Sequence, residues 1–221
     1  MGRSSMAAAL AAGLILATAG SAAAVTPASA VRAGPGEVDT GALVPELAPG
    51  WDWDCKLVAD APLCRTERHH DPTPVVVEDL CESPFRWNIE GTRTSTRHYG
   101  EDYLLYWRTG SVREVETSSR MDGSASFEAR VNTRFTITYD VPGDFDTGTQ
   151  VTKGSLWDFR TDDGGILLRT VGTLVEPYDG EATFTGTVNR AGEVTRLVDA
   201  PLSEVVDDEW IIGTLCALID G

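Results

Sequence analysis

Residues 126–140 read SFEARVNTRFTITYD and carry the clearest strand pattern of the chain. Its odd positions, from Phe127 to Tyr139, hold apolar or small residues, whereas its even positions hold polar or charged ones. A strict period of two predicts a β-strand with one face on a core and the other in water. At about 3.3 Å per residue the strand would be roughly 45 Å long, well beyond the usual three to ten residues. We expect so long a strand to coil, to carry a bulge or to wrap around a barrel.

Segments with a strand signature lie on both sides of this stretch. Phe85, Trp87 and Ile89 alternate with polar residues, and the strand is expected to continue through the threonine-rich residues 92–96. Gly110-Ser111 is typical of a two-residue hairpin turn. Further strands are predicted at 149–159, 166–175, 181–188 and 194–198. About eight strands joined by turns predict an all-β protein, an antiparallel meander that closes into a β-barrel and so leaves no edge exposed.

The first thirty residues have the composition of a secretory leader. One charge, Arg3, precedes an apolar run, and small residues lead to Ala28-Ser29-Ala30. This pattern predicts a signal peptide over 1–30 that is cleaved after Ala30, with cleavage after Ala24 as the alternative. The apolar run is too short to span a bilayer, which takes about 20 residues. We therefore expect a secreted, extracellular protein with no membrane insertion after leader cleavage.

Proline and glycine divide the rest of the chain into three parts. Residues 31–50 are rich in both and predict a flexible tether. Residues 51–74 predict an extension, clasped by a disulfide, that ends in a proline-rich connector. Residues 75–221 form the barrel domain, and the apolar cluster at 205–219 is expected to make a strand and a short helix.

The charge of the chain is strongly acidic. Its 18 basic and 34 acidic residues give a net charge of −16. The predicted leader holds one basic residue, so its removal leaves 17 basic residues and a net charge of −17. Nucleic acid binding needs clustered lysine and arginine, so we expect no nucleic acid partner. We interpret the acidity as a means of keeping an exported protein in solution.

Four cysteines in an exported chain predict two disulfides, which can pair in three ways. Cys55 and Cys64 enclose a short segment suited to a local clasp, whereas Cys81 and Cys216 lie near the two ends of the barrel domain. We therefore prefer the pairs Cys55–Cys64 and Cys81–Cys216. A metal site built from all four thiolates lacks the C-x-x-C spacing.

The sequence carries none of the common catalytic or cofactor motifs. It has no G-x-S-x-G, no P-loop, no G-x-G-x-x-G and no H-E-x-x-H. His69-His70-Asp71 offers metal ligands, but neighbours on an extended chain point in opposite directions. The acidic pairs Asp52/Asp54 and Asp144/Asp146 lack the glycine and distal glutamate of a calcium loop. We therefore predict no catalytic residue, no metal and no cofactor.

Aromatic residues in the predicted strands suggest what a barrel could hold. Four of these aromatic residues are predicted to line a ligand cavity: Trp107, Phe135, Tyr139 and Trp157. Rings that face inward in a small barrel either fill it or line a cavity for one ligand. We expect a non-enzymatic protein that carries a small apolar ligand or serves as a surface interaction module. The alternative is a small-barrel enzyme, a cyclase or isomerase for a hydrophobic substrate, which a buried, strongly perturbed carboxylate or histidine would favour.

Three features from Cys81 onward carry a resemblance. They are Cys81-Glu82-Ser83-Pro84-Phe85 with Gly91 in the strand that follows, the threonine-rich turn into the next hairpin, and the terminal Cys216-Ala217-Leu218-Ile219. With the leader, they make the chain similar to a group of uncharacterised secreted proteins of actinobacteria. The resemblance implies a lipocalin-sized antiparallel β-barrel and supports pairing Cys81 with Cys216. That group has no assigned activity, so no functional residue is implied.

Overall fold

The alternating stretch that dominates the sequence forms strand β6 (Ser126–Tyr139) at the middle of one antiparallel sheet. The structure is a computed structural model and describes residues 37–221. Phe127, Val131 and Tyr139 are buried, and the even positions from 130 to 138 are exposed. Phe135 and Ile137 are half-buried in the same phase. The prediction of a strand with one covered face is confirmed.

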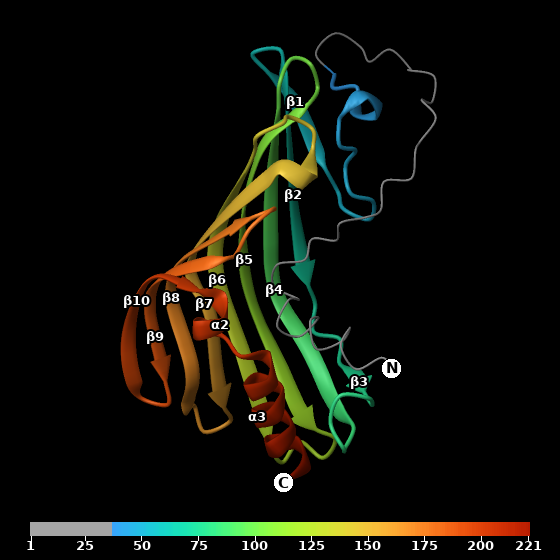
Figure 1. Ribbon diagram of the computed structural model, residues 1–221. Coiled ribbons are helices and arrows are strands. Elements are labelled where there is room, and N and C mark those ends of the chain that lie inside the picture. Colours follow the sequence, from blue (N-terminus) through green and yellow to red (C-terminus); the bar gives the residue numbers. More distant parts are fainter. Residues whose placement is uncertain (1–36) are drawn as a thin grey trace.

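Within residues 37–221, ten strands make up the sheet, and consecutive strands pair almost throughout (Figure 1). The order is β1-β2-β4-β5-β6-β7-β8-β9-β10, with β3 paired to β4 beside this path. The other bounds are β1 Asp54–Val58, β2 Ala61–His70, β3 Val75–Val77, β4 Phe85–Tyr99, β5 Leu105–Arg120, β7 Gly148–Thr161, β8 Ile166–Pro177, β9 Thr183–Arg190 and β10 Glu193–Pro201. Two short 3-10 helices, η1 (Thr40–Ala42) and η2 (Phe145–Thr147), lie in the connections.

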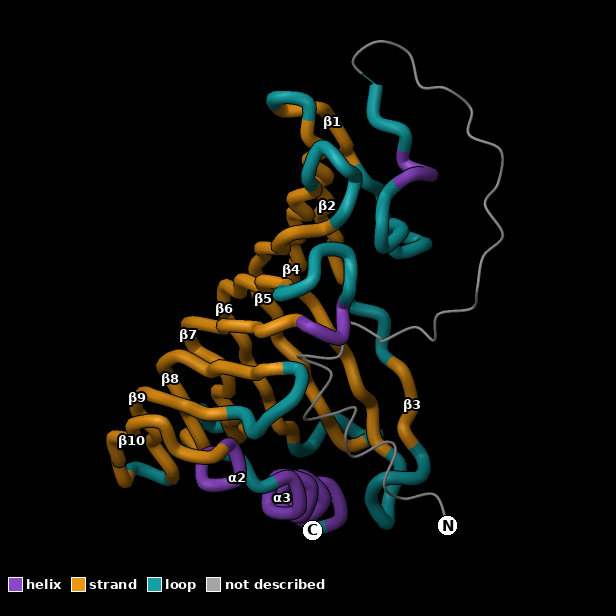
Figure 2. Tube along the Cα trace, turned by 45° about the horizontal axis from the view of Figure 1, so that its top comes forward, coloured by secondary structure: helices purple, strands orange, loops and turns teal. Residues whose placement is uncertain are grey.

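The sheet does not close. Within residues 37–221, β1 pairs only with β2 and β10 pairs only with β9. Figure 2 shows a curved sheet whose two ends lie far apart in the view. The prediction of a closed barrel of about eight strands is therefore wrong. The hairpin of β1 and β2 pairs along β4, which is the edge that a returning β10 would need.

One face of the sheet is covered at both ends, and we call it the helix face. Helix α3 (Asp208–Asp220) packs Ile211, Leu215 and Ile219 onto this face, against a core that includes Phe127 and Phe159. A single helical turn, α2 (Leu202–Val205), leads into it. The expected strand and short helix at 205–219 are thus replaced by one 13-residue helix. The opposite face, in phase with the even residues of β6, is called the open face.

Residues 37–53 cover the other end of the helix face and are called the N-terminal segment. Val38 and Leu43 are buried against Tyr99, Leu105 and Tyr139. Val44 also exchanges backbone hydrogen bonds with this end, donating to Tyr103 O and accepting from Leu105 N. The prediction of a flexible tether is wrong for the described part of 31–50. The predicted signal peptide, both cleavage sites and residues 31–36 lie outside the described residues.

Both predicted disulfides are present. Cys81–Cys216 joins the loop before β4 to α3, and Asp220 at the end of α3 accepts hydrogen bonds from the amides of Glu82 and Ser83. Cys55 and Cys64 face each other across β1 and β2. They therefore staple two strands of the main sheet, and the expectation of a separate clasped extension at 51–74 is wrong.

Two glycines within the long strands have a backbone conformation that favours glycine. Gly91 in β4 has φ +137° and Gly154 in β7 has φ +134°, values that side chains disfavour. A Cβ at Gly91 would lie 2.1 Å from Arg113 O, and one at Gly154 would lie 2.3 Å from Asn132 O. By contrast, Gly110-Ser111 makes no turn, because β5 runs straight through it.

Candidate functional site

The four residues predicted to line a ligand cavity do not gather in one place. Trp107 lies on the open face, 42% exposed, with its ring stacked on His98 at a centroid distance of 4.4 Å. Trp157 is buried in the core that α3 covers. Phe135 and Tyr139 lie on the helix face toward the N-terminal segment, separated on β6 by Ile137 and two open-face threonines. Only these two share a candidate site.

Two arginines face each other beside Phe135 and Tyr139. Arg97 of β4 and Arg108 of β5 are direct cross-strand partners on the helix face. Arg108 lies over the Phe135 ring at 5.3 Å, and its Nε donates to Ser95 Oγ at 2.9 Å. Strand alternation therefore places two guanidinium groups on the same face as the rings of Phe135 and Tyr139.

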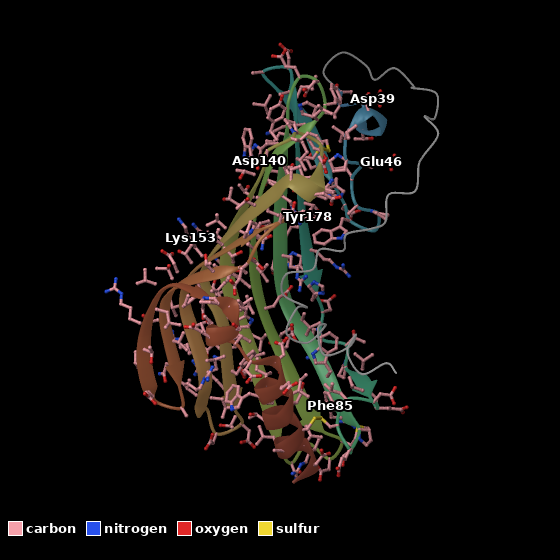
Figure 3. The ribbon with its side chains drawn as sticks, viewed as in Figure 1. Asp39, Glu46, Phe85, Asp140, Lys153 and Tyr178 are labelled. Carbon is pink, nitrogen blue, oxygen red and sulfur yellow. A yellow bond between two sulfur atoms is a disulfide. The ribbon has the colours of Figure 1, made fainter. Side chains whose placement is uncertain are left out.

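The N-terminal segment and η2 cover the first of these arginines. Arg97 is 5% exposed and lies between the rings of Trp53 and Phe145, at 5.0 and 5.7 Å. Its Nη1 donates to the carbonyl of Glu46 at 2.8 Å and to the hydroxyl of Tyr99 at 3.3 Å. Figure 3 labels Glu46 on the segment that lies over this end of the sheet. Cation–π contacts and a carbonyl partly replace the water that this charge has lost.

No carboxylate neutralises this pair. Among the ion pairs of residues 37–221, none includes Arg97 or Arg108, and the buried Nε of Arg97 has no hydrogen-bond partner. Burial, followed by the charge of Arg97, lowers the pKa of Arg108. A buried cation beside a half-buried one, without a counter-ion among the described residues, costs several kcal/mol, and an anion between them would remove much of that cost.

Two tyrosines complete a set of donors around the arginines. Burial raises the pKa of both Tyr99 and Tyr139 and outweighs the opposite effect of the arginines, so both hydroxyls stay protonated at neutral pH. The Tyr99 hydroxyl donates to Pro45 O at 3.2 Å. The Tyr139 hydroxyl makes no hydrogen bond within residues 37–221, which leaves it able to donate to a ligand. We call Arg97, Tyr99, Arg108 and Tyr139 the arginine site.

A second polar cluster lies farther along the same face. Glu114 of β5 is 2% exposed and accepts two hydrogen bonds from Arg93, one of them from Nη2 at 2.7 Å. His70 Nε2 lies 3.5 Å from the same carboxylate. Burial lowers the pKa of His70, although the charge of Glu114 opposes this, so burial favours the neutral ring.

Glu116 is the most perturbed group in this cluster. It follows Glu114 on the same face, is 6% exposed, and accepts a hydrogen bond from Trp87 Nε1 at 3.4 Å. Burial raises its pKa from 4.5 to about 7, with a smaller contribution from the charge of Glu114. A carboxyl group with this pKa can give or take a proton near neutral pH.

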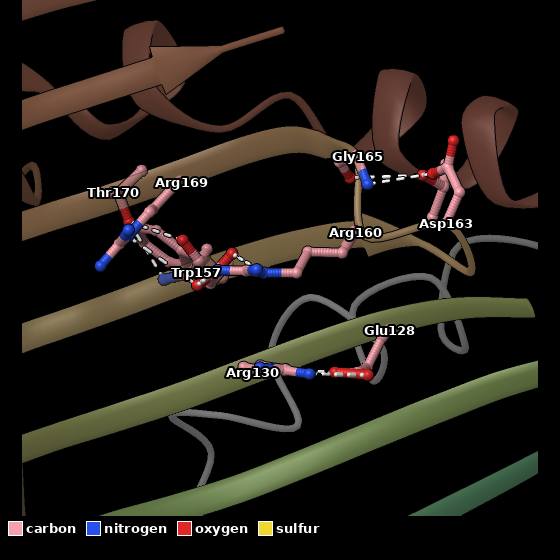
Figure 4. Close-up of polar contacts among 10 residues, drawn as sticks. Glu128, Arg130, Trp157, Arg160, Asp163, Gly165, Arg169 and Thr170 are labelled. Carbon is pink, nitrogen blue, oxygen red and sulfur yellow. Dashed lines mark hydrogen bonds and ion pairs between the residues drawn. The ribbon is translucent and has the colours of Figure 1, made fainter. Parts of the chain in front are cut away.

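The open face carries a separate set of ion pairs around Asp158 (Figure 4). Arg160 binds Asp158 through two hydrogen bonds of 2.8 Å, and Arg169 approaches its Oδ2 at 3.8 Å. Arg130, on the neighbouring strand, pairs with Glu128. Among the ion pairs of the described part of the chain, the other open-face cations Arg113, Arg134 and Lys153 do not occur.

The candidate metal ligands do not form a site. His69 lies beside Glu67 and Thr92, whereas His70 points to Glu114 on the other face, as alternation requires. The Asp144 carboxylate accepts from the amide of Asp146 and caps η2. Within residues 37–221, the one close group of metal-ligand types is Cys81, Cys216 and Asp220, and its two sulfurs form a disulfide.

Comparisons with known proteins give no match. No family model, curated protein or solved structure is similar enough to the chain to be matched. None of the helices in residues 37–221 combines the length and apolar character needed to cross a bilayer.

The sequence carries a signal for one half of the arginine site. Arg97 falls in phase with the apolar residues of β4, at a position where an exposed charge would not be expected, whereas β5 shows no clear apolar phase around Arg108. Charged residues at covered positions point to a functional site more often than charged residues at exposed ones. Glu114 and Glu116 share this property.

Proposed function

We propose that this protein binds a small organic acid with an apolar body, and that Arg97 and Arg108 hold its carboxylate. The observation that carries the proposal is the pair of facing, covered guanidinium groups with no carboxylate partner in residues 37–221. This modifies the expected carrier of an apolar ligand, because the site selects an anionic head group. Secretion and the actinobacterial resemblance remain parts of the proposal.

Arginine suits this role because its planar fork binds both oxygens of a carboxylate. The anion would take the free donors of Arg108, the orphaned Nε of Arg97 and the Tyr139 hydroxyl. Phe135 and Ile137, both half-buried on the same face, would contact the apolar body. The ligand would thus lie along the helix face, with its charge under the N-terminal segment.

Binding of dodecanoate and of dodecanol, measured by isothermal titration calorimetry, tests this proposal. The acid should bind at least about tenfold more tightly than the alcohol, because only the acid forms charge-assisted hydrogen bonds. Arg108→Gln should remove this preference while leaving binding of the alcohol unchanged. Arg86→Gln, an exposed arginine of β4, is the matched control and should bind both as the wild type does.

Two results would contradict the proposal. One is equal affinity of the wild type for the acid and the alcohol. The other is an acid preference that survives Arg108→Gln in a variant whose circular dichroism spectrum shows an intact sheet.

A second candidate is an enzyme that moves a proton on a hydrophobic substrate, of the isomerase or cyclase kind. It is favoured by one observation, the buried pair Glu114 and Glu116 with the raised pKa of Glu116. Deuterium uptake by 2-dodecanone in D2O tests it. A rate that follows a midpoint near pH 7 and is lost in Glu116→Gln would support catalysis, and a rate no faster than that without protein would contradict it.

A further inference from the structure

We infer that the open face of the sheet binds a linear acidic polysaccharide through Arg113, Arg134 and Lys153. This site is separate from the arginine site, because it lies on the other side of the sheet. Figure 3 shows Lys153 on the side turned away from the N-terminal segment that carries Glu46. The inference therefore goes beyond the proposed function and does not depend on it.

The first observation is a pair of like charges that face each other. Arg134 of β6 and Lys153 of β7 are direct cross-strand partners, and both are exposed. Arg113 of β5 faces Asn132, two residues before Arg134 on the same face. Like charges opposite each other destabilise a sheet, so such a pair needs another reason to be there.

The second observation is that these three cations are unpaired. No ion pair among residues 37–221 includes Arg113, Arg134 or Lys153. The contrast with Arg130 and Arg160 on the same face is direct, since each of those holds a carboxylate. In a chain of net charge −16, three neighbouring cations without an acidic partner mark a surface suited to an anion.

The third observation is that the surface is hollowed at these residues. One groove of about 540 Å³ is lined by Arg134, Lys153 and Thr136 among others. A second groove of about 610 Å³ is lined by Arg113 and Ser155, and also by the acidic residues Glu90, Glu114 and Asp158. Asn132 lines both grooves, so they adjoin, and Arg134 and Lys153 lie in the one whose lining holds no acidic residue.

The other side chains of the open face favour sugar over other anions. Threonine, serine and asparagine provide hydroxyl and amide groups that can bond to sugar hydroxyls. Trp107 lies on the same face, is 42% exposed and has its ring stacked on that of His98. Across the sheet it is level with Thr149 of β7, which lies four residues, or about 13 Å along the strand, from Lys153. An exposed ring can stack on the apolar side of a sugar, and a chain of sugar acids would reach from the ring to the cations.

The same features argue against nucleic acid as the partner. Nucleic acid binding gains most of its affinity from many basic residues that release counter-ions. Here three unpaired cations lie within a strongly acidic molecule, so charge alone supplies little affinity for a polyanion, and hydrogen bonds to sugar hydroxyls supply the rest. A polymer whose charges alternate with neutral, hydrogen-bonding groups suits this surface better.

Binding of polygalacturonate at low ionic strength, measured by biolayer interferometry on the full chain, tests the inference. Dextran is the neutral control polymer, and single-stranded DNA is the competing polyanion. The wild type should bind polygalacturonate but neither dextran nor single-stranded DNA, and added salt should weaken the binding. The double variant Arg134→Gln/Lys153→Gln should bind at least about tenfold more weakly, because it lacks two charge-assisted contacts.

Two matched variants separate this site from other causes. Arg196→Gln removes an exposed cation of the open face on distant β10, and Arg108→Gln alters the arginine site, and both should bind the polymer as the wild type does. No binding by the wild type, or equal binding by the double variant, would overturn the inference. Tighter binding of DNA than of polygalacturonate would overturn the assignment of the partner.

Discussion

The two ends of the helix face are covered in different ways. At one end, α3 lays Ile211, Leu215 and Ile219 on an apolar core, and Cys81–Cys216 fixes the helix there. At the other end, a segment without regular structure beyond η1 lies over tyrosines and the charged Arg97. Apolar burial stabilises a fold, whereas a buried unpaired charge opposes folding. The α3 end therefore stabilises the molecule, whereas the N-terminal end is where a function can be sought.

The largest expected effect tests the α3 end by removing its disulfide. Cys81→Ser/Cys216→Ser should lower the free energy of unfolding by about 5 kcal/mol, because the bond closes a loop of 135 residues. Cys55→Ser/Cys64→Ser, whose loop has nine residues, should cost about 3 kcal/mol. Urea denaturation of both variants measures this, and a larger loss from the shorter loop would contradict the loop-entropy argument.

The next effect compares the apolar cover at the two ends. Leu215→Ala in α3 should lower the free energy of unfolding by about 3 kcal/mol, because Leu215 is 3% exposed. Leu43→Ala removes an equally buried side chain of the N-terminal segment. It should instead open that segment, since no disulfide holds residues 37–53, and so speed proteolytic cleavage near residue 50. Equal losses on urea denaturation with unchanged proteolysis would show that both ends unfold as one unit.

The next prediction concerns the pH dependence of stability that Glu116, a buried carboxyl group on the helix face, should cause. Its pKa of about 7 in the folded protein lies above the ordinary 4.5, so folding favours the protonated form. This contribution is fully present below pH 4.5 and is lost as the pH rises to about 7, a change of roughly 3 kcal/mol at most. Glu116→Gln should therefore flatten the fall in stability between pH 5 and pH 8.

Urea denaturation across this pH range measures the effect of Glu116→Gln. The exposed Glu90 of β4 offers the control, and Glu90→Gln should keep the pH dependence of the wild type. If the stability of Glu116→Gln falls with pH as steeply as that of the wild type, another group causes the pH dependence.

The smallest effect concerns the start of α3. Asp207 caps the helix, and its carboxylate accepts a hydrogen bond from the amide of Trp210 at 3.1 Å. Asp207→Ala should lower the free energy of unfolding by about 1 kcal/mol, whereas Asp207→Asn should retain most of the wild-type value. Thermal denaturation distinguishes the two variants, and equal losses would show that charge matters more than the cap.

Local patterns in the sequence predicted the strands well because a period of two is a local property. Residues 126–140 identified both β6 and its covered face, and the positions of the cysteines identified both disulfides. Closure of the sheet into a barrel is not a local property, because it depends on where the hairpin of β1 and β2 pairs. Helix α3 could have been recognised from Ile211, Leu215 and Ile219, which recur every four residues.

The arginine site was harder to predict, because only Arg97 falls in phase with the apolar residues of its strand. Arg97 and Arg108 meet only because β4 and β5 pair in one particular register. The turn expected at Gly110-Ser111 would have placed these two residues in a different pairing. Side chains from distant segments, such as Trp53 and Phe145, join the site only through tertiary packing.

Strand β10 leaves one rim of the sheet unpaired within residues 37–221, and its details limit what can attach there. The register shifts between Leu197 and Ala200, and Asp199 has a left-handed backbone with φ 49°. Another chain could continue the ladder along 193–197 but would lose its hydrogen bonds at the irregularity. The irregularity in β10 therefore limits the addition of further strands at this edge, and so limits growth of the open sheet into fibres.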